Sequence, residues 1–218
     1  MTTEERYGGV IAWFQENVPV AESELKYRDP YQLMVAVILS AQCTDKRVNL
    51  ITPAFFVKFP TLKSLAEANR DDVFGLISSC SYPNNKTLHL INASRKIVND
   101  YGGILPTEVD DLMTIPGIGR KTANVIASVA FGKEALAVDT HVFRVSERIG
   151  LTTGSRNPFE TEKQLTSHIP GELHAIAHHW LILHGRYICQ ARKPRCGECG
   201  LREYCRYYCE SASPASGL

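Results

Sequence analysis

The stretch Ile115-Pro116-Gly117-Ile118-Gly119-Arg120-Lys121-Thr122-Ala123 joins two segments with helical hydrophobic patterns, and it decides the fold that we expect. Pro116 ends the first segment, because proline cannot donate the hydrogen bond that a continuing helix needs. The Gly-x-Gly turn permits positive φ and close approach, and the helix N-terminus after it stabilises an anion such as a DNA phosphate. The stretch therefore predicts a helix-hairpin-helix element. We expect its DNA contacts at Gly117, Ile118, Gly119 and Arg120.

Lys121 opens the second helix of this element, and its residue type allows two interpretations. A lysine beside a phosphate-binding turn most often only contacts phosphate. As a nucleophile it would need an uncharged amine, and therefore a lowered pKa. A helix N-terminus, burial and the neighbouring Arg120 all disfavour an ammonium group there, and a neutral amine suits Schiff-base chemistry. The residues alone leave both interpretations open.

Helical signals continue on both sides of the hairpin, and no sustained period-two alternation is present. The segment 85–101 has a helical apolar face and ends at Gly102-Gly103. Asn157-Pro158 has the residues of a helix start, and the apolar segment 171–183 contains Trp180. The 218-residue chain is therefore expected to be all-α.

Asp139 lies at the start of another helical segment, 139–149, just after an apolar approach. One interpretation is that its carboxylate only caps this helix. The other is that it stabilises positive charge on a sugar or moves a proton to and from an attacking amine. Local sequence favours the capping role without excluding the catalytic one.

Charge and hydropathy exclude few classes of protein. The net charge is +1, but residues 183–209 carry six Arg or Lys against two Glu, which is either an ordinary solvated surface or a nucleic-acid-binding stretch. The longest unbroken apolar run, 33–39, is far below the ~18 residues of a membrane span. No export signal opens the chain. We expect a cytoplasmic, nucleoid-associated protein without a membrane partner.

Four cysteines near the C-terminus have the spacing C-x6-C-x2-C-x5-C, and these are Cys189, Cys196, Cys199 and Cys205. Such a tight group in a chain without export signals indicates a metal centre. Structural zinc and a [4Fe–4S] cluster both use four cysteines, and the residues alone do not separate them. A second metal candidate, His174 with His178 at helical spacing, lacks a third ligand, and ordinary packing is the better interpretation.

Five motifs in order resemble the endonuclease III family of helix-hairpin-helix DNA glycosylase/lyases. They are Leu39-Ser-Ala-Gln-Cys-Thr-Asp45, the hairpin 116–123, Val138-Asp-Thr-His-Val-Phe-Arg144, His179-Trp-Leu-Ile-Leu-His-Gly-Arg186 and the four cysteines. The resemblance covers roughly residues 10 to 207.

The resemblance implies an all-α fold of two lobes. Residues 23–133 would form a six-helix barrel that contains the helix-hairpin-helix. Residues 1–22 and 134–209 would form the iron–sulfur lobe, with a [4Fe–4S] cluster on the four cysteines, and 210–218 a disordered tail. Zinc is thereby disfavoured.

The resemblance also implies a reaction on double-stranded DNA that contains a damaged base or an abasic site. Lys121 would attack the sugar, Asp139 would assist, and strand cleavage would follow by β-elimination. Gln42 would fill the space left by the extruded base, while Lys193 and Arg195 would contact phosphate. Oxidised pyrimidines are the expected lesions, and a monomer is the expected state.

One segment departs from the family. Many members read Gly-Leu-Tyr-Asn, whose leucine is a wedge between bases, where this chain reads Cys80-Ser-Tyr-Pro-Asn-Asn85. Ser81 is a poor apolar wedge, so Tyr82 or a neighbour would substitute. The rival functions are a monofunctional, adenine-specific type of glycosylase, which lacks the hairpin lysine, and a non-catalytic DNA-binding module, which would not need Lys121 together with Asp139.

Overall fold

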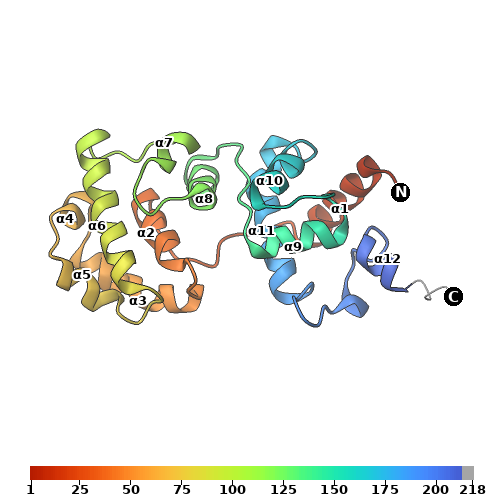
Figure 1. Ribbon diagram of the computed structural model, residues 1–218, viewed down its shortest axis with the longest axis horizontal. Coiled ribbons are helices and arrows are strands. Elements are labelled where there is room, and N and C mark those ends of the chain that lie inside the picture. The colour runs from red at the N-terminus through yellow and green to blue at the C-terminus, as the bar shows by residue number, and fades with distance from the viewer. Residues whose placement is uncertain (213–218) are drawn as a thin grey trace. The chain divides into compact units, whose positions relative to one another are not determined.

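The computed structural model describes residues 1–212, and within these it is all-α, as expected. The chain divides into two compact units (Figure 1), one formed by Ser23–Lys133 and the other by Met1–Glu22 together with the chain from Glu134 onward. Among the described residues, no helix is both long and apolar enough to cross a membrane.

The unit Ser23–Lys133 is built around an apolar helix. Its helices are α2 (Pro30–Ser40), α3 (Asp45–Lys58), α4 (Leu62–Ala66), α5 (Arg70–Ile77), α6 (Pro83–Asp100), α7 (Val109–Met113) and α8 (Arg120–Phe131). Helix α2 is buried along most of its length, from Tyr31 to Leu39, and packs against α3, α6 and α8. Figure 1 shows the long helix α6 beside α4 and α5, in agreement with its packing contacts. This arrangement holds α8, and with it Lys121, on the central helix.

The other unit joins the first helix to the second half of the chain. Its elements are α1 (Thr3–Asn17), α9 (Thr140–Ile149), α10 (Pro158–Thr166), the 3-10 turn η1 (Gly171–Leu173), α11 (His174–Tyr187), the 3-10 turn η2 (Cys196–Glu198) and α12 (Arg206–Ala212). Phe14 of α1 stacks on Trp180 of α11, with ring centroids 5.3 Å apart. The Trp180 Nε1 donates to the Val18 carbonyl at 2.8 Å. These contacts attach the N-terminal helix to the helix that leads into the cysteines.

Several helix boundaries differ from the sequence prediction, and α6, expected over 85–101, spans Pro83–Asp100. The segment expected as a helix over 171–183 begins as the 3-10 turn η1, and its α-helical part, α11, extends to Tyr187. The disordered tail was expected to start at residue 210, but residues 210–212 are helical, because α12 continues to Ala212. The rest of that predicted tail, 213–218, lies outside the described residues.

Candidate functional site

The hairpin turn depends on Gly117 for its shape. Gly117 has φ +83°, and a Cβ added there would lie 2.6 Å from the Cβ of His89 on α6. A side chain at this position would therefore be strained and would also collide with the neighbouring helix. Gly119 differs, because its φ is −86° and an added Cβ would meet no atom within 4 Å. The open space beside Gly119 is where a ligand backbone could approach.

Ile118 belongs to the interior of the hairpin. Its side chain is only 4% exposed, and its N–H donates to the Ile115 carbonyl at 3.0 Å. Ile118 therefore stabilises the turn from within. This placement leaves Gly119 and Arg120, at the start of α8, as the hairpin residues better placed for a phosphate contact.

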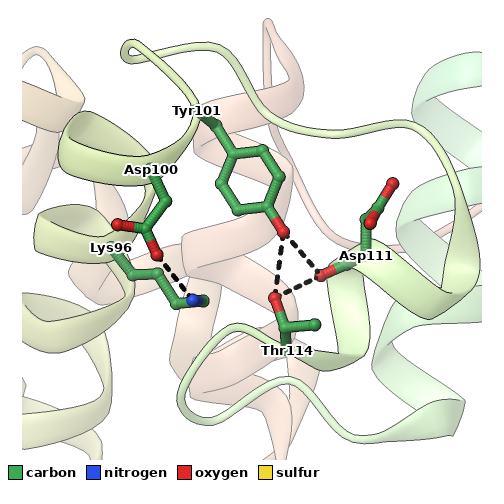
Figure 2. Close-up of polar contacts among 5 residues, drawn as sticks. All are labelled: Lys96, Asp100, Tyr101, Asp111 and Thr114. Carbon is green, nitrogen blue, oxygen red and sulfur yellow. Dashed lines mark hydrogen bonds and ion pairs between the residues drawn. The ribbon is translucent and has the colours of Figure 1, made fainter.

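The helix before the hairpin is anchored to the end of α6 (Figure 2). The Tyr101 hydroxyl lies 3.0 Å from the Thr114 Oγ1 and 3.5 Å from the Asp111 carbonyl. Thr114 in turn donates to the Asp111 carbonyl at 2.8 Å. These bonds hold the end of α7 directly before Ile115, so the hairpin starts from a fixed position.

Lys121 lies in the first turn of α8, two residues after Gly119, and is half-buried. Gly119 is the N-cap of this 12-residue helix and makes no side-chain cap bond. The local positive potential of the helix N-terminus therefore acts at the turn that carries Lys121. This is the setting in which the sequence predicted either a phosphate contact or an amine nucleophile.

Asp139 is the N-cap of α9. Its Oδ1 accepts hydrogen bonds from the N–H groups of His141 and Val142, both at 2.8 Å. The capping interpretation is therefore confirmed. Both bonds use Oδ1, so capping leaves Oδ2 for a second role, and the half-buried carboxylate is held in one orientation by the helix it caps.

The four cysteines predicted as ligands line one pocket together with Ile149, Ile188, Leu201, Tyr207 and Tyr208. Burial raises the pKa of the Cys199 and Cys205 thiols, and the charges of the other cysteines raise it further. The thiols line the pocket without converging on one point, since among the described residues no three His, Cys, Asp or Glu side chains are placed to hold a single ion. If the four thiols lose their protons, the resulting thiolates need a positively charged centre, which either zinc or an iron–sulfur cluster would provide.

Two arginines on α9 hold the loop that carries the first cysteine. Arg144 donates from Nη2 to the carbonyls of Gly185 and Cys189, at 2.9 and 3.1 Å. Arg148 donates to the carbonyls of Gln190 and Ala191, at 2.7 and 2.8 Å. Sequence reasoning missed this role, although the two arginines are four residues apart and so share a helix face.

His184 lies beside the cysteines as a neutral ring. Its Nε2 is 3.6 Å from the Cys199 Sγ, and burial lowers its pKa to about 4. The Arg148 Nη1 also donates to one of the cysteines, the Cys189 Sγ, at 3.6 Å. Donors close to cluster sulfurs adjust the electronic properties of a cluster.

The basic residues between the first two cysteines are exposed but differ in their partners. The Arg195 guanidinium contacts Glu198 with two nitrogens, at 3.2 and 2.5 Å. Lys193 forms no ion pair with any described residue. Because an exposed ion pair is weak, Arg195 can exchange Glu198 for a phosphate, but Lys193 needs no such exchange.

The histidine pair considered as a metal site is buried and bonded to the backbone. The His174 Nε2 lies 3.0 Å from the Ile169 carbonyl, and the His178 Nδ1 lies 2.7 Å from the Ala137 carbonyl. Both rings therefore have the packing role that the sequence favoured.

Three residues lie in the two loops that were expected to act between the bases, and these are Gln42, Ser81 and Tyr82. The Ser81 hydroxyl donates to the Gln42 carbonyl at 2.6 Å, so Ser81 ties two loops together. Its neighbour Tyr82 is 67% exposed. Gln42 is also exposed, with φ +55°.

Comparisons with known proteins identify relatives of this chain over most of its length. The family model for HhH-GPD superfamily base excision DNA repair proteins matches residues 35–170. The model for the iron–sulfur binding domain of endonuclease III matches residues 189–205, which begin and end at cysteines of the predicted cluster. The match confirms an iron–sulfur centre in place of zinc.

Individual relatives and solved structures agree with the family models. Endonuclease III of Bacillus subtilis is 45% identical, and the match covers 86% of this chain and 86% of that protein. Endonuclease III of Escherichia coli K12 is 39% identical, and the match covers 91% of this chain and 93% of that protein. A solved trapped endonuclease III–DNA covalent intermediate, 39% identical, has a TM-score of 0.91 over 97% of this chain and 99% of its own. A thermostable thymine-DNA glycosylase is 24% identical and shares the fold. Its TM-score is 0.85, and the match covers 95% of this chain and 99% of that one.

Proposed function

Since the chain belongs to the endonuclease III family within the HhH-GPD superfamily of base excision repair proteins, we propose that it is bifunctional. It removes oxidised pyrimidines from double-stranded DNA and then cleaves the strand 3′ to the abasic site. DNA glycosylase and lyase activity, DNA binding and a [4Fe–4S] cofactor follow from the family itself. The lesion class, the residue roles, action as a monomer and nucleoid association are parts of the proposal.

Lys121 is the proposed nucleophile. Its uncharged Nζ attacks C1′ of the damaged nucleotide, the base leaves with the electrons of the glycosidic bond and takes up a proton, and the nitrogen loses a proton. The C1′–O4′ bond then breaks, O4′ takes up a proton, and the nitrogen lone pair forms the C1′=N bond of a protonated Schiff base. Removal of a C2′ proton then expels the 3′ phosphate, and water releases the sugar and restores the amine. The observation that carries the proposal is the position of Lys121 in the first turn of α8, directly behind the hairpin.

Asp139 is the proposed acid–base partner. A carboxylate whose Oδ1 is fixed by two N–H groups presents Oδ2 in a defined direction. That oxygen can stabilise positive charge on the sugar as the base leaves, and it can exchange a proton with the attacking amine.

DNA contacts are proposed at the start of α8 and in the basic loop. Gly119 and Arg120 would bind the backbone, with Gly117 and Ile118 shaping the turn that presents them. Lys193, with Arg195 after it leaves Glu198, would bind a second phosphate. Gln42, on its exposed loop, would fill the stack from which the base is extruded.

Cys189, Cys196, Cys199 and Cys205 are the proposed cluster ligands. When bound, the cluster supplies a covalent link among four points of the chain and a reduction potential that nearby hydrogen bonds can tune. Arg144 and Arg148 order the loop from Cys189 to Ala191 from the side of α9. This loop leads directly into Lys193, so correct folding around the cysteines places the proposed phosphate contact.

The test is borohydride trapping on a duplex with one abasic site. Wild type and Lys133→Gln, a surface-lysine control in the same unit, should form a covalent adduct and nick the strand. Lys121→Gln should bind this duplex with near-native affinity but form no adduct and make no nick. Trapping by Lys121→Gln would refute the nucleophile assignment. Base release without trapping by wild type would indicate a monofunctional glycosylase, and binding alone would indicate a non-catalytic module.

A further inference from the structure

Two cysteines lie apart from the predicted cluster ligands. Cys43, in the loop between α2 and α3, and Cys80, in the loop between α5 and α6, belong to the unit Ser23–Lys133, whereas the other five cysteines belong to the other unit. The Sγ atoms of Cys43 and Cys80 are 3.8 Å apart, and Cys43 donates a weak hydrogen bond to Cys80. The two positions are 37 apart in the sequence, so helix packing has brought two free thiols into direct contact.

The two thiols differ in exposure to solvent. Cys80 is only 5% exposed, whereas Cys43 is half-buried. Burial and the neighbouring Cys43 raise the pKa of the Cys80 thiol to about 11, although the charges of Lys86 and Arg47 oppose the increase. An oxidant from solution therefore reaches Cys43 first, and Cys80 is the protected thiol beside it. This is the usual arrangement of a reacting cysteine and a resolving cysteine.

The backbone beside both cysteines is strained. Gln42, directly before Cys43, and Tyr82, two residues after Cys80, have φ values of +55° and +52°, and within residues 1–212 they are the only non-glycine residues with positive φ. Such a backbone conformation costs energy and persists where surrounding contacts hold it. One of these contacts is the hydrogen bond from the Ser81 Oγ to the Gln42 carbonyl, at 2.6 Å. The two loops therefore have little freedom to absorb a movement of either cysteine.

We propose that Cys43 and Cys80 are a reversible oxidation site, which a peroxide converts into a disulfide, and that this disulfide weakens DNA binding by moving the loop of Gln42. A disulfide bond holds two sulfurs much closer together than two thiols in contact. Because the Ser81 bond and the strained backbone fix both loops, part of the movement is passed to Gln42. The inference rests on the proposed function, since it uses the proposed contact of Gln42 with the DNA stack.

The oxidation takes two steps, in which atoms and electrons balance. The Cys43 thiolate attacks one oxygen of hydrogen peroxide, the O–O bond breaks, and the leaving hydroxide takes up the proton that the thiol lost, which gives a sulfenic acid and water. The Cys80 sulfur then attacks the Cys43 sulfur, the S–O bond breaks, and the hydroxyl group leaves as water with the Cys80 proton. Two thiols together lose two electrons, and one peroxide is reduced to two waters. A dithiol reverses the change by thiol–disulfide exchange.

The site is tested by treating the folded, iron-loaded protein with hydrogen peroxide and mapping its peptides by mass spectrometry. Cys209→Ala is the parent protein, because it removes the exposed thiol outside the pair. The parent should give a peptide pair cross-linked through Cys43 and Cys80, with two hydrogens fewer than the separate peptides. The cross-link should disappear on treatment with dithiothreitol. Absence of the cross-link after peroxide treatment would overturn the site.

The order of the two steps is tested by removing one thiol of the pair at a time from the parent. With Cys80→Ala added, the Cys43 sulfenic acid has no resolving thiol and should be trapped by dimedone. With Cys43→Ala added, the buried Cys80 should remain a free thiol under the same treatment. Dimedone labelling of Cys80 without labelling of Cys43 would overturn the assignment of Cys43 as the residue that reacts first.

The consequence for DNA is tested by equilibrium binding to a duplex with one tetrahydrofuran abasic analogue. The oxidised parent should bind roughly tenfold more weakly than the reduced parent, which corresponds to about 1.4 kcal/mol, and dithiothreitol should restore the affinity. The parent with Cys43→Ala is the matched control, and its affinity should be the same before and after peroxide. The visible absorption of the cluster is followed in both proteins, so that damage to the cluster is detected. Unchanged affinity of the cross-linked parent would overturn the proposed effect on binding.

These outcomes are separate from the proposed function. Borohydride trapping by the reduced parent reports on Lys121, whatever the state of Cys43 and Cys80. Trapping without any peroxide-induced cross-link would remove this inference and leave the enzyme assignment in place. A cross-link in a protein that does not trap DNA would keep the oxidation site and overturn the proposed nucleophile.

Discussion

Asp139 allows its two roles to be separated by substitution, because each role needs a different property of the side chain. Capping needs an oxygen at Oδ1, where the N–H groups of His141 and Val142 are each 2.8 Å away. The proposed chemistry needs a charged oxygen that can carry a proton. Asn keeps the first property and loses the second, whereas Ala loses both.

The expected magnitudes differ accordingly. Asp139→Ala should lower the free energy of unfolding by about 1 kcal/mol, the usual value for an N-cap. Asp139→Asn keeps the cap bonds and loses only the favourable interaction of a negative charge with the helix N-terminus, about 0.3–1 kcal/mol. Both variants should reduce the single-turnover rate of base release by roughly 100-fold or more, the usual contribution of acid–base catalysis.

A capping residue elsewhere in the same unit provides the control. Asn157 caps α10, and its Oδ1 accepts from the Glu160 N–H at 2.9 Å. Asn157→Ala should lose about 1 kcal/mol of stability with a native rate of base release. The assays are urea unfolding and single-turnover base release on a duplex with one oxidised pyrimidine. A near-native rate in Asp139→Asn would leave Asp139 with a capping role alone.

Three other predictions concern the hairpin, the basic loop and the cluster. Gly117→Ala should destabilise the protein by about 2–4 kcal/mol, because of its positive φ and the contact with α6. Gly119→Ala should cost at most about 1 kcal/mol yet weaken DNA binding, and native affinity would place that turn away from DNA. Lys193→Ala should reduce the slope of log K against log salt by about 0.9, and an unchanged slope would remove the basic loop from the interface. Cys205→Ala should lose iron and the broad visible absorption while Cys209→Ala, outside the predicted set, keeps both; iron retained in full by Cys205→Ala would exclude it as a ligand.

Several features could be predicted from the sequence because they depend on neighbours along the chain. The hairpin follows from proline and glycine within a few residues, and the helix starts follow from capping residues such as Asp139 and Asn157. The cluster motif follows from four cysteines within seventeen residues. In each case the relevant atoms are brought together by local geometry, so residue type and spacing contain enough information.

Other features required the tertiary structure. Ser81 and Gln42 are 39 residues apart, and Arg148 and Gln190 are 42 apart, so their hydrogen bonds form only after helices have packed. The clash that excludes a side chain at Gly117 depends in the same way on α6 meeting the hairpin. The sequence by itself determined which chemical groups are available, because residue type and local spacing are encoded directly. Packing decided which of them hold the fold and which remain exposed, because long-range contacts depend on the positions of whole helices.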